Sequence, residues 1–108
     1  MTKFFWISYD FGLKGDYESI YTWLDSHDAK ECGDSFAYIK KYSFKSDFIE
    51  ELKADLSTNV NLKKKDRIYI IYKKDDGSIS GLFLYGSRKR NPWEGFASGT
   101  GESEDTND

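Results

Sequence analysis

The alternation of apolar and polar residues at the start of the chain predicts a strand followed by a helix. Residues 3–11 are rich in aromatic and β-branched side chains, which is typical of a buried strand. Two glycines bracket the loop that follows, and Asp16 is placed to cap a helix that ends near His27. Apolar residues at positions i, i+3, i+4 and i+7 mark one face of this helix: Tyr17, Ile20, Tyr21 and Leu24.

Two more strands and a second helix are predicted in the middle of the chain. Residues 29–32 are a short strand or a loop, Gly33-Asp34 is a tight turn, and residues 35–42 form a clearer strand. Ser46 is the predicted cap of a helix over residues 47–57. The apolar stripe of that helix consists of Phe48, Ile49, Leu52 and Leu56.

The strongest strand pattern in the chain covers residues 66–72, Asp-Arg-Ile-Tyr-Ile-Ile-Tyr. Asp76-Gly77 predicts a two-residue hairpin turn, and residues 79–85 form the returning strand. The single proline, in Asn91-Pro92, is expected to stop this strand. Two aromatic residues beyond the proline are expected to pack back on the domain, Trp93 and Phe96.

The order of these elements is strand, helix, two strands, helix, strand, strand, which predicts an α+β domain. Split βαβ units in this order form the ferredoxin-like arrangement, βαββαβ, here with an extra C-terminal hairpin strand. The predicted domain covers residues 1–96. Residues 97–108 contain four acids, no base and no aromatic residue, and are predicted to be a disordered acidic tail.

Charge and cysteine content narrow the classes of function. The net charge of −3 reflects the acidic tail, because the rest of the chain holds 16 bases and 15 acids. One cysteine, Cys32, and one histidine, His27, exclude an intrachain disulfide and a zinc site. A structural role for Cys32 is favoured over a nucleophilic one. No apolar run is long enough to span a membrane, so a cytoplasmic location is expected.

Asp10 is the candidate metal ligand, because it ends the first, apolar strand in Ser8-Tyr9-Asp10. A carboxylate at the end of a central strand can reach a cleft and hold a hard divalent cation such as Mg²⁺ or Mn²⁺. One carboxylate is a poor metal site, but a symmetric dimer would bring two together. The alternative, which the sequence favours, is that Asp10 accepts hydrogen bonds from the backbone of the loop at residues 12–15.

Seven basic residues lie at the open end of the predicted hairpin, where they could contact the phosphates of RNA or DNA. A two-residue turn at Asp76-Gly77 would place Lys65 opposite Arg88, with further basic pairs beyond them. Like charges on paired strands repel, so phosphate, water or the acids Asp66 and Glu94 could compensate them. A solvated loop end is the favoured alternative. The seven residues are Lys63, Lys64, Lys65, Arg67, Arg88, Lys89 and Arg90.

In a ferredoxin-like sheet the first strand lies antiparallel to the last core strand. Asp10 is therefore expected near the start of the strand at residues 66–72, beside the basic residues and the start of the helix that Asp16 caps. Such an edge would be either a metal and phosphate site or a salt-bridged edge. Three strand tyrosines are further candidates, as stacking faces for bases, although strands favour tyrosine in any case: Tyr69, Tyr72 and Tyr85.

Four segments carry a family resemblance. Residues 5–10 form a strand that ends in Tyr-Asp, residues 17–24 form the helix after it, and residues 34–40 and 66–71 supply two further strands. Together they resemble the small ferredoxin-like proteins related to the second CRISPR-associated protein, to the virulence-associated D toxins and to the SinR-like proteins. The resemblance implies a ferredoxin-like fold, a homodimer, and metal-dependent cleavage of RNA or DNA with Asp10 as the metal ligand.

Two classes of function fit this pattern. One is a metal-dependent nuclease, or a non-catalytic descendant of one, that acts as a dimer with paired Asp10 carboxylates. The other is a non-catalytic protein–protein interaction module, such as a toxin–antitoxin or regulatory component, that pairs through sheet edges. The basic end of the hairpin favours the nuclease. The absence of a second acid or base beside Asp10 favours the interaction module.

Overall fold

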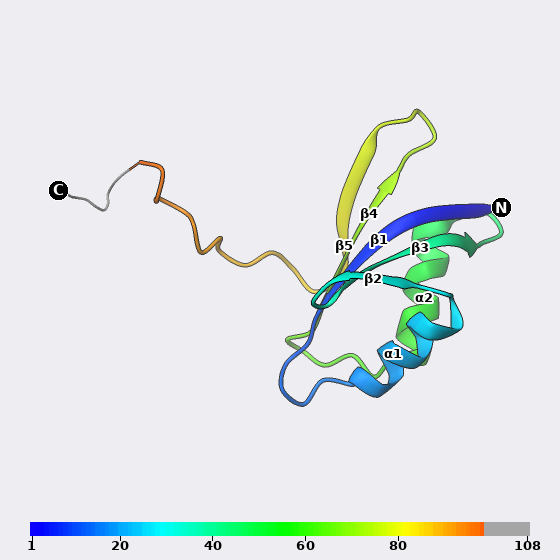
Figure 1. Ribbon diagram of the computed structural model, residues 1–108, viewed down its shortest axis with the longest axis horizontal. Helices are drawn as coiled ribbons and strands as arrows, with labels where there is room; N and C mark the ends of the chain where they lie inside the picture. Colours follow the sequence, from blue (N-terminus) through cyan, green and yellow to red (C-terminus); the bar gives the residue numbers. More distant parts are fainter. Residues whose placement is uncertain (99–108) are drawn as a thin grey trace.

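The computed structural model describes residues 1–98, which contain two helices and one antiparallel sheet of five strands (Figure 1). The strand order is β2-β3-β1-β4-β5, so β1 lies at the centre and β2 and β5 form the edges. In chain order the elements are β1 (Thr2–Asp10), α1 (Tyr17–Ser26), β2 (Lys30–Gly33), β3 (Phe36–Ser43), α2 (Phe48–Asn59), β4 (Arg67–Lys73) and β5 (Ile79–Tyr85).

The predicted class, an α+β domain, is confirmed. Each helix connects two strands that are separated by one other strand, since β3 lies between β1 and β2, and β1 lies between β3 and β4. This arrangement is compatible with the predicted ferredoxin-like fold. The strand order as a whole differs from that of the four-stranded fold, because β5 continues the sheet beyond β4.

Both helices cover the same face of the sheet, and the hydrophobic core lies between them and alternate strand residues (Figure 1). On β1 the side chains of Phe5, Ile7 and Tyr9 are buried, whereas the residues between them are partly or fully exposed. The same alternation holds on β4, where Ile68 and Ile70 are buried. The other face of the sheet carries no helix within residues 1–98.

The apolar face of α1 differs from the prediction at one position. Ile20 and Leu24 are buried as expected, but Tyr21 is 54% exposed and Trp23 is buried instead. Trp23 follows Ile20 by three residues, so it lies on the same face of the helix. Its indole Nε1 donates a hydrogen bond to the Asp55 carboxylate of α2 at 3.2 Å, which joins the two helices.

The cap of α2 is Asp47, so the prediction of Ser46 was wrong by one residue. Oδ1 of Asp47 accepts a hydrogen bond from the backbone N–H of Glu50 at 3.2 Å. Ser46 contributes its own backbone N–H, which donates to the Glu51 carboxylate at 2.8 Å. A cap must reach the third residue of the helix, and Asp47 is the one at that spacing. Three residues of the predicted apolar stripe are buried: Phe48, Leu52 and Leu56.

The hairpin between β4 and β5 turns through three residues, not the two that the sequence predicted. The backbone N–H of Lys74 donates to the carbonyl of Ser78 at 2.8 Å, and that of Gly77 donates to the carbonyl of Lys74 at 2.9 Å. Gly77 has a φ of +90°, a left-handed conformation that glycine adopts without strain and that closes a three-residue turn. The strands therefore pair one residue out of the predicted register along most of their length.

The predicted cross-strand pairs of basic residues are not formed. The paired part of the hairpin ends at Ile68 and Tyr85, so Lys65 and Arg88 lie outside it. Beyond this point the chain leaves the sheet at Gly86, which has a φ of +78°. A Cβ atom at Gly86 would lie 2.7 Å from a backbone carbonyl oxygen of the segment that enters β4, so this close approach requires glycine.

Trp93 and Phe96 do not pack on the domain, contrary to the prediction. Their exposed fractions are 68% and 81%. Local hydrogen bonds hold this segment in turns, and the change of direction at Gly86 carries it away from the core. Most of the predicted tail, residues 99–108, lies outside the described residues. Within residues 1–98, neither helix has the length and apolar character needed to cross a membrane.

Candidate nucleic-acid interface

Asp10 and Arg67 are in direct contact at the edge of the sheet where β1 ends. They lie opposite each other in the antiparallel register of β1 and β4. The Arg67 guanidinium donates to Oδ2 of Asp10 from Nη2 at 2.5 Å and from Nε at 3.1 Å. Nζ of Lys89 lies 3.9 Å from the same oxygen. The expected proximity of Asp10 to basic residues is therefore confirmed, and its carboxylate takes part in ion pairs there.

The carboxylate that binds the loop after β1 belongs to Asp66, not to Asp10. Asp66 is only 2% exposed. Its Oδ1 accepts a hydrogen bond from the backbone N–H of Gly12 at 3.3 Å, and its Oδ2 accepts one from that of Lys63 at 2.7 Å. Strand alternation turns Asp10 to the helix-free face, whereas Asp66 points inward. Asp66 therefore joins the loop after β1 to the segment before β4. Its carboxylate does not neutralise the charge of the basic side chains.

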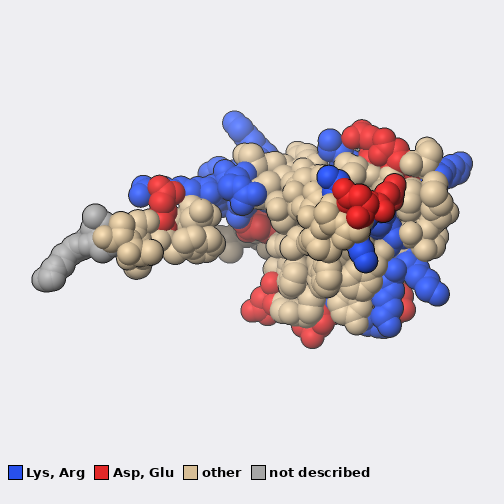
Figure 2. Space-filling model, turned by 90° about the horizontal axis from the view of Figure 1, so that it is seen from above, with Lys and Arg blue, Asp and Glu red and all other residues tan. Residues whose placement is uncertain are grey.

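Three of the seven predicted basic residues gather beside Asp10, and we call them the basic edge: Arg67, Arg88 and Lys89. Arg67 and Arg88 line a pocket of about 270 Å³ together with Asp10. Three cations next to one carboxylate leave an excess of positive charge. Figure 2 shows Lys and Arg side chains gathered where the C-terminal segment leaves the globular part of the molecule.

The remaining four basic residues are placed differently. Nε of Arg90 lies 3.5 Å from Glu94, and both side chains are exposed. Lys63 contributes to the lowered pKa of Asp16, although the main cause is the hydrogen bond that this carboxylate accepts from the backbone N–H of Asn61. Two exposed lysines lie in the turn that precedes β4, Lys64 and Lys65.

Aromatic rings lie beneath the guanidinium groups of the basic edge. Cζ of Arg88 is 5.4 Å from the ring centroid of Phe83 and 5.8 Å from that of Tyr69. Cζ of Arg67 is also 5.8 Å from the Phe83 centroid. A guanidinium at this distance from a ring is attracted by its π electrons. The two rings therefore help to hold both arginines on the helix-free face of the sheet.

Of the three tyrosines predicted as stacking faces, Tyr69 alone lies beside the basic edge. Tyr72 packs on Phe48 in the core, with ring centroids 5.4 Å apart, and Tyr85 lines a different pocket. Phe83 was missed because a phenylalanine in an apolar strand is most often a core residue. Its position opposite Tyr69 follows from the three-residue turn, whereas the predicted two-residue turn would pair Tyr69 with Leu84.

Asp10 alone does not provide a divalent-cation site. Its Oδ2 already binds Arg67, and within residues 1–98 no three His, Cys, Asp or Glu side chains converge. Mg²⁺ and Mn²⁺ require several oxygen ligands. The chain would fit such an ion only if a second copy or bound phosphates supplied the missing ligands. An Mg²⁺ or Mn²⁺ ion at Asp10 therefore stays a prediction.

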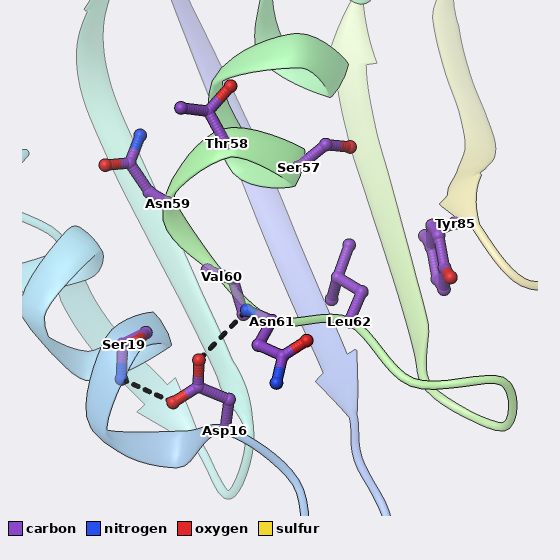
Figure 3. A pocket seen from close by; sticks show the side chains of 9 residues that line it. All are labelled: Asp16, Ser19, Ser57, Thr58, Asn59, Val60, Asn61, Leu62 and Tyr85. Atoms are coloured by element: carbon purple, nitrogen blue, oxygen red, sulfur yellow. Dashed lines mark hydrogen bonds between the residues drawn. The ribbon is translucent and has the colours of Figure 1, made fainter.

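A second pocket, of about 520 Å³, lies between the start of α1 and the end of α2 (Figure 3). Asp16 borders it and accepts hydrogen bonds from the backbone N–H groups of Ser19 at 3.2 Å and Asn61 at 2.9 Å. These bonds satisfy donors that an anion would otherwise use, and the carboxylate repels negative charge. The start of α1 is therefore unsuited to phosphate.

His27 and Cys32 take no part in either pocket. The His27 ring lies 4.4 Å from that of Trp23, and its Nε2 is 3.7 Å from the Asp55 carboxylate. This histidine therefore belongs to the contact between α1 and α2. Cys32 is exposed on the edge strand β2.

The chain was compared with models of protein families, with curated proteins and with solved structures. No family model, no curated protein and no solved structure matches the chain.

Proposed function

We propose that this protein binds nucleic acid at the basic edge, through contacts between its cations and phosphate groups. The observation that carries the proposal is the excess of positive charge around Asp10, where Arg67 and Lys89 both approach one carboxylate and Arg88 lines the same pocket. Lys and Arg side chains supply most of the affinity of proteins for nucleic acid, independently of sequence. In this proposal Asp10 positions Arg67 and is not catalytic.

Reversal of charge at Lys64 and Lys89 tests the proposal. Lys89 belongs to the basic edge, and Lys64 is exposed in the turn before β4. Labelled RNA and DNA are titrated with protein at several salt concentrations, and fluorescence anisotropy gives the affinity. The wild type should bind more weakly as salt rises. The Lys64→Glu/Lys89→Glu variant should bind more weakly still, and the slope of log K against log salt should fall by about 1 for each lost contact.

A matched reversal controls for net charge. Lys53 lies on α2, and Lys74 lies at the far end of the hairpin from Arg67. The Lys53→Glu/Lys74→Glu variant has the same net charge as the Lys64→Glu/Lys89→Glu variant and should bind nearly as well as wild type. Equal losses in both variants would show an effect of net charge alone. If the Lys64→Glu/Lys89→Glu variant binds with wild-type affinity, the basic edge is only a solvated surface.

Metal-dependent cleavage is a second candidate, favoured by the exposure of Asp10 beside cations that can hold phosphate. Its side chain is 51% exposed. A homodimer that pairs two Asp10 carboxylates would supply ligands that one copy lacks. Cleavage of labelled RNA and DNA is compared for wild type and Asp10→Ala, with and without Mg²⁺ or Mn²⁺. Metal-dependent cleavage that the variant loses would support this candidate, and equal traces would leave Asp10 as a partner of Arg67.

A ferredoxin-like origin belongs to the same proposal. The two interleaved βαβ connections support it, as does a first strand that ends in Tyr9-Asp10, like that of the small proteins related to the second CRISPR-associated protein. Fold alone does not decide function. A wild-type protein that binds neither RNA nor DNA would favour the interaction module, for which the exposed edge strand β2 offers a pairing surface.

A further inference from the structure

The helix-free face of the sheet is lined with aromatic rings. Alternate residues of four strands point there, as the cross-strand pairs of Trp6 with Tyr38 and of Tyr69 with Phe83 show. All are at least partly exposed. Aromatic side chains that stay partly exposed on one surface can serve as stacking faces for a flat ligand. We call this surface the aromatic face, and it consists of Phe4, Trp6, Phe36, Tyr38, Tyr69 and Phe83.

The rings of this face form separate groups rather than one continuous apolar surface. Phe4 stacks on Tyr38, with centroids 5.5 Å apart and planes inclined by 18°, and meets the edge of Trp6 at 4.8 Å. The rings of β4 and β5 form a second pair at 4.7 Å. Between the groups lies the small side chain of Ser8, opposite Tyr69 in the register. The face therefore holds two groups of partly exposed rings.

Gly81 determines how the Tyr69 ring lies. A Cβ atom at Gly81 would come within 2.9 Å of Cζ of Tyr69, so the tyrosine ring extends over the glycine. Any larger residue at this position would displace it. The Tyr69 side chain consequently extends across β5, with its ring 4.7 Å from that of Phe83 in an edge-to-face arrangement.

Cations border the aromatic face at both ends. The basic edge lies at one end, with Arg88 only 5.4 Å from the Phe83 centroid. At the other end Lys40 is exposed on β3, two residues beyond Tyr38 and on the same side of the strand. Two copies placed face to face would bring these like charges together, so a second copy is a poor occupant. A polyanion that carries flat rings would complement both the cations and the aromatic groups.

We propose that the aromatic face binds a single-stranded nucleic acid, whose bases stack on the rings while its phosphates contact the basic edge. Unpaired bases expose their faces, whereas those of a duplex are stacked on one another and cannot reach aromatic side chains. The inference rests on the proposed nucleic-acid binding and adds its substrate class, an unpaired strand in preference to a duplex.

Anisotropy titrations with three labelled probes test the inference: an RNA strand of about ten nucleotides, the DNA strand of the same sequence, and its DNA duplex. Tyr38→Ala should weaken single-strand binding about 5- to 100-fold and leave duplex binding unchanged. Tyr69→Ala should weaken single-strand binding by a similar factor and duplex binding by a smaller one, because the Tyr69 ring also helps to hold Arg88. Tyr69→Phe keeps the ring and should retain the affinity of the wild type. The salt dependence should not change in any of these variants, because no charge is removed.

Tyr21→Ala is the matched control, since Tyr21 is an exposed aromatic residue on the helix side of the molecule. It should bind all probes like the wild type, and circular dichroism checks that each variant folds. The inference is overturned if both alanine variants bind single strands as tightly as wild type while charge reversal at the basic edge still weakens binding. In that case the proposed function stands. If the wild type binds no probe, both are overturned. A preference for either single strand over the duplex supports the inference and identifies RNA or DNA as the ligand.

Discussion

Asp10 ends β1 and Asp66 precedes β4, and strand alternation gives the two carboxylates different partners. Asp10 points to the helix-free face, where it is half exposed and binds Arg67. Asp66 points inward, where it is buried and accepts two backbone hydrogen bonds. A buried acceptor that satisfies two backbone donors supports the fold, whereas an exposed ion pair contributes little stability. Asp66 is therefore expected to contribute more to stability than the ion pair of Asp10 with Arg67.

The start of α2 yields a prediction at the same scale. Asp47→Ala should lower the free energy of unfolding by about 1 kcal/mol, because the backbone N–H of Glu50 loses its acceptor. Ser46→Ala should change it by no more than about 0.5 kcal/mol, because Ser46 donates through its backbone. Urea unfolding followed by circular dichroism measures both. A larger loss in Ser46→Ala than in Asp47→Ala would contradict the observed cap.

At the scale of elements, hydrogen bonds to the Glu51 carboxylate join α2 to the segment that leaves β3. Glu51 accepts hydrogen bonds from the backbone N–H groups of Ser46 and Lys45, both at 2.8 Å, and of Asp47 at 2.9 Å. These bonds stabilise the charged form and hold the pKa of Glu51 at about 2, below its ordinary value of 4.5. The connection between the strand and the helix therefore depends on an ionised Glu51.

Glu51→Gln should reduce stability at pH 7, and the difference from wild type should shrink in acid. Because the pKa is lower in the folded state, the stabilisation is complete above about pH 4.5 and is lost as the pH falls towards about 2. Urea unfolding at several pH values measures the difference. Glu50→Gln is the control, since that carboxylate lies 4.0 Å from Lys53 on the exposed side of α2. A difference for Glu51→Gln that stayed constant down to pH 2 would contradict this account.

At the scale of the whole molecule, the two faces of the sheet differ in what covers them. Helices α1 and α2 cover one face and complete the core. The other face carries the aromatic face and the basic edge, and no element of residues 1–98 covers it. After Gly86 the chain leaves the sheet without adding to the core. We therefore expect the helix-covered face to supply most of the stability, and we propose that the helix-free face binds nucleic acid.

The exposed C-terminal rings test this division. The double substitution Trp93→Ala/Phe96→Ala should change the free energy of unfolding by no more than about 0.5 kcal/mol, because both rings are largely in solvent. Leu56→Ala, at a residue that is 1% exposed, should cost about 2–5 kcal/mol. Urea unfolding compares the two proteins. A loss in the double variant as large as that in Leu56→Ala would place the rings against the core.

The sequence by itself determined the order of strands and helices, the cap at Asp16 and the proximity of Asp10 to basic residues. These follow from local rules. Apolar residues repeat every second position in a strand and every third or fourth in a helix, and the order of elements brings the end of β1 beside the start of β4. The hairpin register was harder to predict, because one additional turn residue shifts every pair, and Asp76-Gly77 suits both two- and three-residue turns.

Only the tertiary structure decided which aromatic residues belong to the core. Residues 3–11 have the composition of a strand buried on both faces, yet helices cover only one, so Phe4 and Trp6 lie on the other. The structure also decided that Asp66 rather than Asp10 binds the loop after β1. Burial and hydrogen-bond partners depend on which distant segments cover each face of a strand. The local pattern of residues along the chain does not contain that information.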